Sequence, residues 1–120
     1  MDISAIEGEE LASVLFLQEY VQFDFNGPVL TLFHWPEVFI PEGSQMADGS
    51  YAFGDPGYRD ALCLQIGEPT ESTSFEEGSA LEIKFENGTI FRSSLREEDY
   101  EGSEAGQYLS GFDGDSLEVF

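Results

Sequence analysis

Few side chains in this sequence are of the types that activate a nucleophile or hold a transition metal. The chain has one histidine, His34, and one cysteine, Cys63, so a Cys–His pair would need the fold to bring two distant segments together. It lacks the four Cys or His ligands of a structural zinc site, and it has neither a glycine-rich phosphate loop nor a nucleophile elbow. We therefore expect a non-enzymatic protein with no catalytic residues, no metal and no cofactor.

Carboxylates are the one chemical group present in excess. Twenty-five acidic residues face four basic ones, which gives a formal net charge of −21. The densest acidic region, which contains no basic residue, comprises Glu97, Glu98, Asp99, Glu101 and Glu104, followed by Asp113 and Asp115. Carboxylate oxygens are the ligands that calcium prefers, but this spacing fits no twelve-residue calcium loop. The sequence therefore predicts no metal site in this region either.

The acidity has three interpretations on the sequence alone: adaptation to high salt, a merely solvated surface that resists aggregation, or a surface that meets a basic partner. It excludes a protein that grips nucleic acid through phosphate contacts, because such contacts need Lys and Arg. We favour a basic protein partner, a toxin or a nuclease, whose cationic groups would pair with the carboxylates.

Aromatic residues near the acids indicate where such a partner would bind. Tyr100 lies inside the acidic cluster, and a mixture of charge and aromatic surface is typical of interfaces. The predicted partner-binding residues are Trp35, Glu97, Glu98, Asp99, Tyr100, Glu101 and Glu104. Tyr51 and Phe53 are further candidate anchors, because aromatic side chains dominate the centres of interfaces.

The apolar content predicts a folded chain despite the charge. Hydrophobic residues make up 41% of the sequence, and the aromatic residues are too numerous for a disordered acidic tail. The length suits a single domain covering residues 1–120. The lone cysteine, the lack of a signal-peptide pattern and the lack of an apolar run of ~20 residues favour a cytoplasmic location without membrane contact.

Hydrophobic periodicity predicts the strands that must position these residues. Residues 11–33 are predicted to form three strands, with an apolar run at 14–17 covered on both faces and a turn at Asn26-Gly27-Pro28. Residues 81–95 are predicted to form a hairpin around Asn87-Gly88. A two-residue turn would pair Arg92 with Ile83 on the core face, so either a bulge or a position at a barrel rim is needed.

The clearest helix is predicted at residues 55–66. Asp55 suits the N-cap, Pro56 suits the first helical position, and Gly67 suits the stop. We therefore expect an α+β fold, in which this helix packs on an antiparallel, twisted sheet or a partly open barrel of six to eight strands. The expected core comprises Val14, Phe16, Val21, Phe23, Phe25, Leu30, Leu32, Leu62, Ile66, Leu81, Ile83 and Phe85.

Three stretches together resemble a group of small, uncharacterised bacterial proteins, some of which are similar to the immunity proteins of polymorphic toxin systems. These stretches are YVQFDFNGPVLT at 20–31 with Trp35-Pro36, GDPGYRDALC at 54–63, and FENG at 85–88 with SLREEDY at 94–100 and Glu104-Ala105. The resemblance implies a binding protein and brings no catalytic residues.

We therefore expect an immunity-type inhibitor that occludes a basic toxin or nuclease. One alternative is a small ligand-binding or enzymatic domain that uses a pocket between sheet and helix, for which a deep polar pocket containing His34 and Cys63 would be the sign. The other alternative is a scaffold domain whose acidic surface is merely solvated. The oligomeric state is not predicted.

Overall fold

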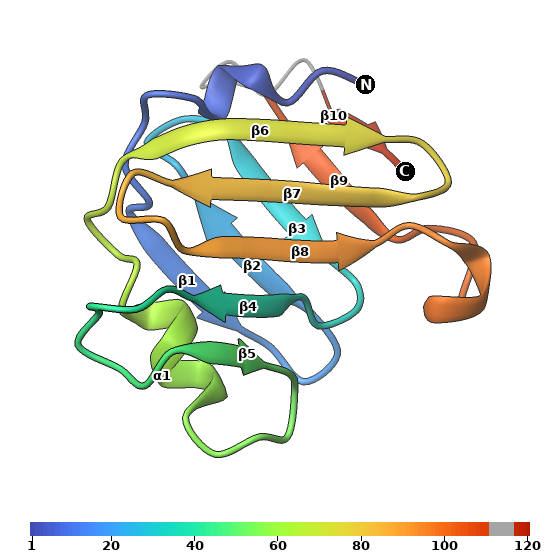
Figure 1. Ribbon diagram of the computed structural model, residues 1–120. Coiled ribbons are helices and arrows are strands. Elements are labelled where there is room, and N and C mark those ends of the chain that lie inside the picture. Colours follow the sequence, from blue (N-terminus) through green and yellow to red (C-terminus); the bar gives the residue numbers. More distant parts are fainter. Residues whose placement is uncertain (111–116) are drawn as a thin grey trace.

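Two antiparallel sheets form the framework of the fold in the computed structural model, which describes residues 1–110 and 117–120 (Figure 1). Within these residues there are ten strands, five in each sheet. The first sheet has the order β1 (Ser13–Phe16), β2 (Val21–Asp24), β3 (Val29–Leu32), β9 (Gly106–Leu109) and β10 (Leu117–Val119). The second has the order β5 (Gly49–Tyr51), β4 (Glu37–Ile40), β8 (Ile90–Ser94), β7 (Ala80–Phe85) and β6 (Thr70–Glu76).

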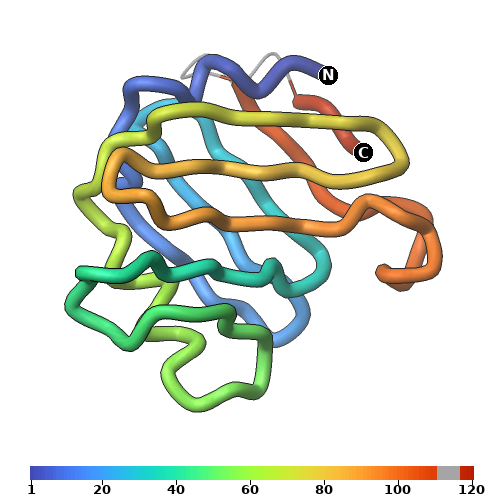
Figure 2. Tube along the Cα trace, in the orientation of Figure 1, coloured from blue at the N-terminus to red at the C-terminus, as the bar shows by residue number. Residues whose placement is uncertain are grey.

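The two sheets lie face to face, and their strands cross at an angle (Figures 1 and 2). The chain passes from the first sheet to the second between β3 and β4, and it returns between β8 and β9. The short helix α1 (Tyr58–Cys63) contacts β1 and β4 and so lies against one strand of each sheet. Two single-turn 3-10 helices, Ser4–Ile6 and Glu97–Asp99, complete the regular structure of the described residues.

The core lies between the sheets because alternate residues of each strand point inward. Phe91 of β8 is its clearest marker: its ring centroid lies 5.2 Å from that of Phe23 in the first sheet and 4.8 Å from that of Phe85 on β7. Nine of the twelve predicted core residues are buried, whereas Val14 and Phe16 are half-buried and Ile66 is 46% exposed. The prediction that 14–17 is covered on both faces is wrong, because the outer face of β1 is open and Leu15 on it is 50% exposed.

The hairpin of β7 and β8 resolves the position of Arg92. The Phe85 N–H donates to the Thr89 carbonyl, so the loop has three residues and ends on Gly88 with φ +94°. A three-residue loop with a left-handed last residue shifts the pairing by one position relative to a two-residue turn. Ile83 therefore pairs with Phe91, and Arg92 pairs with Glu82 on the outer face, where the two side chains form an ion pair.

The predicted helix at 55–66 is shorter in the structure, and its predicted cap is wrong. Gly57 has φ +83°, a left-handed conformation that prevents a helix from starting at Pro56. Asp55 instead accepts a hydrogen bond from the Ala52 N–H at 2.8 Å and closes the preceding turn. From Gln65 on, the backbone bonds span three residues instead of four, so the chain reaches Gly67 through turns. Ile66 lies on those turns and leaves the core.

The predicted fold class is therefore correct in outline and wrong in detail. The sheets are antiparallel, and one helix packs against them, but the described residues contain ten strands instead of six to eight, and the two sheets do not close into a barrel.

The outer edge of β6 is protected by the segment that follows the first 3-10 turn. There the Glu7 carboxylate accepts hydrogen bonds from the Thr73 N–H at 2.8 Å and from its hydroxyl at 3.0 Å.

Candidate functional site: an acidic and aromatic surface at one end of the sandwich

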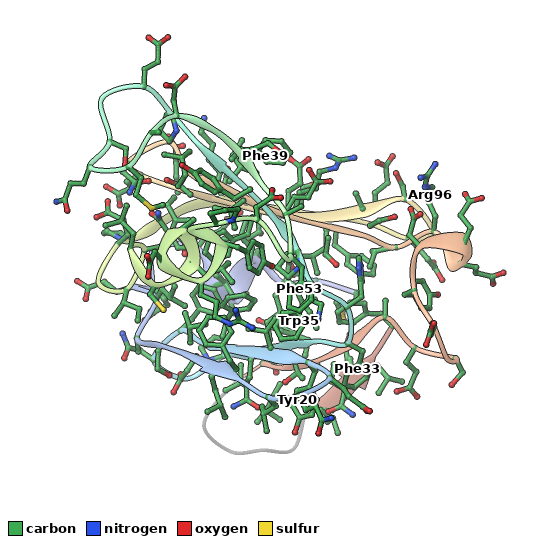
Figure 3. The ribbon with its side chains drawn as sticks, turned by 90° about the horizontal axis from the view of Figure 1, so that it is seen from below. Tyr20, Phe33, Trp35, Phe39, Phe53 and Arg96 are labelled. Atoms are coloured by element: carbon green, nitrogen blue, oxygen red, sulfur yellow. The ribbon has the colours of Figure 1, made fainter. Side chains whose placement is uncertain are left out.

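Three connections meet at one end of the sandwich and carry most of the predicted binding residues. They are the β1–β2 turn, the β3–β4 connection and the long β8–β9 connection, whose residues line shared depressions. Figure 3 shows Phe33 and Trp35, from the β3–β4 connection, near Tyr20 and Phe53. We define the acidic–aromatic surface as Glu19, Tyr20, Phe33, Trp35, Glu98, Tyr100, Glu101 and Glu104.

Five of the seven predicted partner-binding residues line one depression of about 470 Å³. The five are Trp35, Glu98, Asp99, Tyr100 and Glu101, and they are joined by Phe33 and His34. A neighbouring depression of about 550 Å³ shares Phe33 and Glu101 and is also lined by Glu104, together with Glu19 and Tyr20.

Glu97 faces a different part of the molecule. It lines a depression of about 430 Å³ with Phe75 and Phe120, which lies apart from the acidic–aromatic surface except that Tyr100 borders both. The other acids that the sequence added to this cluster, Asp113 and Asp115, lie outside the described residues. The sequence places Glu97 in one cluster with Glu98 and Glu101, but the fold directs it to a separate depression.

Asp99 holds the β8–β9 connection in place. Its carboxylate accepts a hydrogen bond from the Ser94 hydroxyl at 2.5 Å and another from Arg96 Nε at 2.9 Å. These interactions, first the Ser94 bond and then the Arg96 bond, hold the pKa of the Asp99 carboxyl below its ordinary value. Both hydrogen bonds go to Asp99 Oδ2, so Asp99 ties this connection to Ser94 at the end of β8. Glu98 and Glu101 are exposed.

Trp35 belongs to an aromatic cluster with Phe16 and Phe53. The rings of Trp35 and Phe53 stack with centroids 4.7 Å apart and an interplanar angle of 13°, and the Phe16 centroid lies 6.5 Å from that of Trp35. Phe53 is 52% exposed, so this candidate anchor lies at the surface. Tyr51 lies elsewhere, on β5, and its hydroxyl donates to the Ala47 carbonyl at 2.7 Å.

Arg59 is held by this cluster and not by an acid. Its guanidinium carbon lies 5.9 Å from the ring centroid of Phe16 and 5.8 Å from that of Phe53. The other three basic residues, Lys84, Arg92 and Arg96, each pair with at least one carboxylate. Among the described residues, no ion pair of Arg59 is found.

His34 and Cys63 are not arranged as a nucleophile and its base. His34 Nε2 lies 2.8 Å from the Ser94 carbonyl oxygen and 3.0 Å from the Ser93 hydroxyl oxygen, so this nitrogen is already engaged by β8. Cys63 lies on α1, and in the described part of the chain it lines none of the depressions that contain His34. Partial burial, and then the Asp60 carboxylate, raise the pKa of the Cys63 thiol, the opposite of what activates a nucleophile.

Sequence reasoning missed Tyr20, Phe33 and Glu19. The rings of Tyr20 and Phe33 meet edge to face with centroids 6.1 Å apart, which joins the β1–β2 turn to the end of β3. One signal was available: Phe33 and Trp35 are two residues apart at a strand end, so their side chains are expected on the same side of the chain. Nothing in the sequence pattern pointed to the approach of Tyr20.

No metal site is found in residues 1–110 and 117–120, where no three potential ligands of the His, Cys, Asp and Glu types gather closely enough. The helices of these residues are all too short or too polar to span a bilayer. No protein-family model, curated protein or solved structure gives a significant match to this chain. Its function must therefore be inferred from the acidic–aromatic surface itself.

Proposed function

We propose that the protein is a non-enzymatic binding protein that uses the acidic–aromatic surface to occlude a basic partner, as an immunity-type inhibitor occludes a toxin or a nuclease. The observation that carries the proposal is the convergence of Phe33, Trp35 and Tyr100 with the exposed carboxylates of Glu98 and Glu101 around one depression. Aromatic side chains anchor interfaces, and carboxylates steer a basic surface toward them.

The charge balance of this surface supports a cationic partner. Its four acids, Glu19, Glu98, Glu101 and Glu104, have one basic residue close by, Arg96. Arg96 lies 2.9 Å from the Asp99 carboxylate and 3.6 Å from that of Glu98, so its charge is already engaged. If the partner is a nuclease, the inhibitor's carboxylates would occupy the place of the phosphates of its substrate.

A direct test uses the products of the reading frames that flank the gene, because an immunity gene normally lies beside its toxin. We expect one of these products to be basic, to form a complex with this protein in size-exclusion chromatography and to lose its activity there. Neutral replacement of Glu98, Glu101 and Glu104 by Gln should weaken the complex. The matched control replaces the exposed acids Glu10, Glu42 and Asp48 by Gln or Asn and should not weaken it.

If neither flanking product binds, or if both triple variants weaken binding equally, the acidic–aromatic surface is not the binding surface. The second of these outcomes would mean that the total charge matters and its position does not. It would favour the interpretation of the acidity as a merely solvated surface.

A second candidate function rests on a depression of about 620 Å³ beside the first. It is lined by His34, Trp35, Glu37, Arg92 and Arg96, among others, and it mixes cationic, anionic and aromatic groups, as a site for a small polar ligand does. Both of its guanidinium groups already pair with carboxylates, Arg92 with Glu82 and Arg96 with Asp99. A fluorescence titration of Trp35 with small polar metabolites, repeated for Arg92→Ala, tests this alternative.

A further inference from the structure

Arg59 shows how the aromatic residues of this end of the sandwich hold a cation. It belongs to a chain with 25 acidic residues, yet its guanidinium lies over the rings of Phe16 and Phe53. A guanidinium is planar and more weakly hydrated than an ammonium group, so it stacks on aromatic faces at little desolvation cost. Phe16 and Phe53 therefore form a guanidinium-binding surface that the chain's own arginine already uses, and Trp35 stacks against both of these rings.

The adjoining depression combines aromatic rings with carboxylates. Phe33, Trp35 and Tyr100 contribute half-buried rings, and Glu98 and Glu101 contribute exposed carboxylates. No Lys or Arg is among its lining residues, and Arg96 pairs with Glu98 from outside the depression at 3.6 Å. Trp35 is common to the cluster that holds Arg59 and to this depression.

We propose that this depression receives an arginine side chain of the basic partner, in preference to a lysine. The guanidinium would stack on the face of the Tyr100 ring that is turned away from His34, and the carboxylates of Glu98 and Glu101 would accept its hydrogen bonds. Arginine fits better than lysine because its planar fork can stack on a ring and donate two parallel hydrogen bonds at once. The inference rests on the proposed function, since it specifies which group of the partner the acidic–aromatic surface recognises.

Trp35 makes the inference measurable, because it is the single tryptophan of the chain and lines the depression. The probes are two peptides of equal length and charge, one with arginine alternating with glycine and one with lysine alternating with glycine. We expect the arginine peptide to change the emission of Trp35 and to bind about two- to fivefold more tightly than the lysine peptide, as an exposed cation–π contact implies.

Two variants locate the effect. Tyr100→Ala should reduce the affinity for the arginine peptide to that for the lysine peptide, while Glu101→Gln should weaken both peptides. The matched control is Phe39→Ala, because Phe39 is also a half-buried aromatic residue but lies on the outer face of β4, away from the depression (Figure 3). It should change neither affinity. Circular dichroism of each variant confirms that the fold is retained.

The outcomes separate this inference from the proposed function. If both peptides bind equally, leave Trp35 unchanged and are weakened by neutralising Glu98, Glu101 and Glu104, the acidic surface binds cations but the arginine site is wrong. If neither peptide binds at low salt, the inference and the proposed function both fail. If Phe39→Ala lowers the affinity as much as Tyr100→Ala does, the arginine lies elsewhere and the assigned depression is wrong.

Discussion

Replacing Phe91 by Ala should destabilise the protein more than any change on its outer surface. Phe91 is 2% exposed, and its ring contacts Phe23 of the opposite sheet and Phe85 of its own. Removing its side chain loses about 2–3 kcal/mol of hydrophobic transfer energy and two aromatic pairs of about 0.5–1.5 kcal/mol each. These contributions add to about 3–6 kcal/mol, and truncated core phenylalanines usually cost about 3–5 kcal/mol, so we expect a loss of about 3–5 kcal/mol.

Urea unfolding of the wild type and the variant measures this loss. A chain of this length has a total stability of about 6–18 kcal/mol, so the variant should still fold, with a clearly lower midpoint. Phe39→Ala is the matched control, because it makes the same chemical change on the outer face of β4 and should cost less than half as much. A double-mutant cycle between Phe23 and Phe91 should give a coupling energy of at least about 0.5 kcal/mol. Equal losses for Phe91→Ala and Phe39→Ala, or no coupling, would refute the packing of the two sheets.

Three further predictions concern side chains and charges near the candidate site. Tyr58→Phe should cost about 1–3 kcal/mol in urea unfolding, because the buried Tyr58 hydroxyl donates to the Pro36 carbonyl at 2.5 Å and this acceptor would lose its partner. Carbon-detected NMR should give Asp99 a pKa below its ordinary value of 3.8, and Ser94→Ala should raise that pKa. Because the pKa is lowered in the folded state, the contribution of Asp99 to stability is present above pH 3.8. It is lost as the pH falls through the lowered pKa. An unshifted carboxyl would show that the bonds from Ser94 and Arg96 do not form in solution. Raising sodium chloride from low concentration to about 0.5 M should raise the melting temperature, because screening weakens repulsion within a chain of net charge −21. An unchanged melting temperature would mean that the charges are too dispersed to matter.

Local turn chemistry and apolar alternation were sufficient to predict the central hairpins. Asn26 and Gly27 have φ of 59° and 140°, and the Phe25 N–H donates to the Pro28 carbonyl, so the predicted turn joins β2 to β3. Alternating apolar residues on β2 and β7 point into the core as predicted. Both signals are local, which is why one sequence is enough to detect them.

The elements that sequence reasoning missed lack an apolar pattern. The strand β6 has the sequence TESTSFE and is mostly exposed, because it is an edge strand whose pairing depends on β7 and on the Glu7 side chain. The three-residue strand β5 also lies at an edge and contains Gly49. Such strands are specified by their neighbours, so the predicted count of six to eight strands was too low.

The candidate site was predicted in part for a similar reason. The acidic cluster and its tyrosine are contiguous in the sequence, so composition alone pointed to Glu98, Tyr100 and Glu101. The contribution of Tyr20 depends on a contact with Phe33 across two connections, which only the sheet topology creates. That Asp99 is hydrogen-bonded within the chain also depends on where Ser94 and Arg96 lie, which the sequence does not reveal.

The measurement that tests the central claim most directly is the association rate constant with the basic product of a flanking reading frame, recorded by stopped flow from Trp35 emission at increasing salt. If the acidic–aromatic surface captures that partner, the rate constant should fall about tenfold or more between roughly 50 and 300 mM salt. The variant with Glu98, Glu101 and Glu104 replaced by Gln should associate more slowly at low salt and depend less on salt, while the Glu10, Glu42 and Asp48 control should follow the wild type. A rate constant that is independent of salt, or equal in the two triple variants, would contradict the claim.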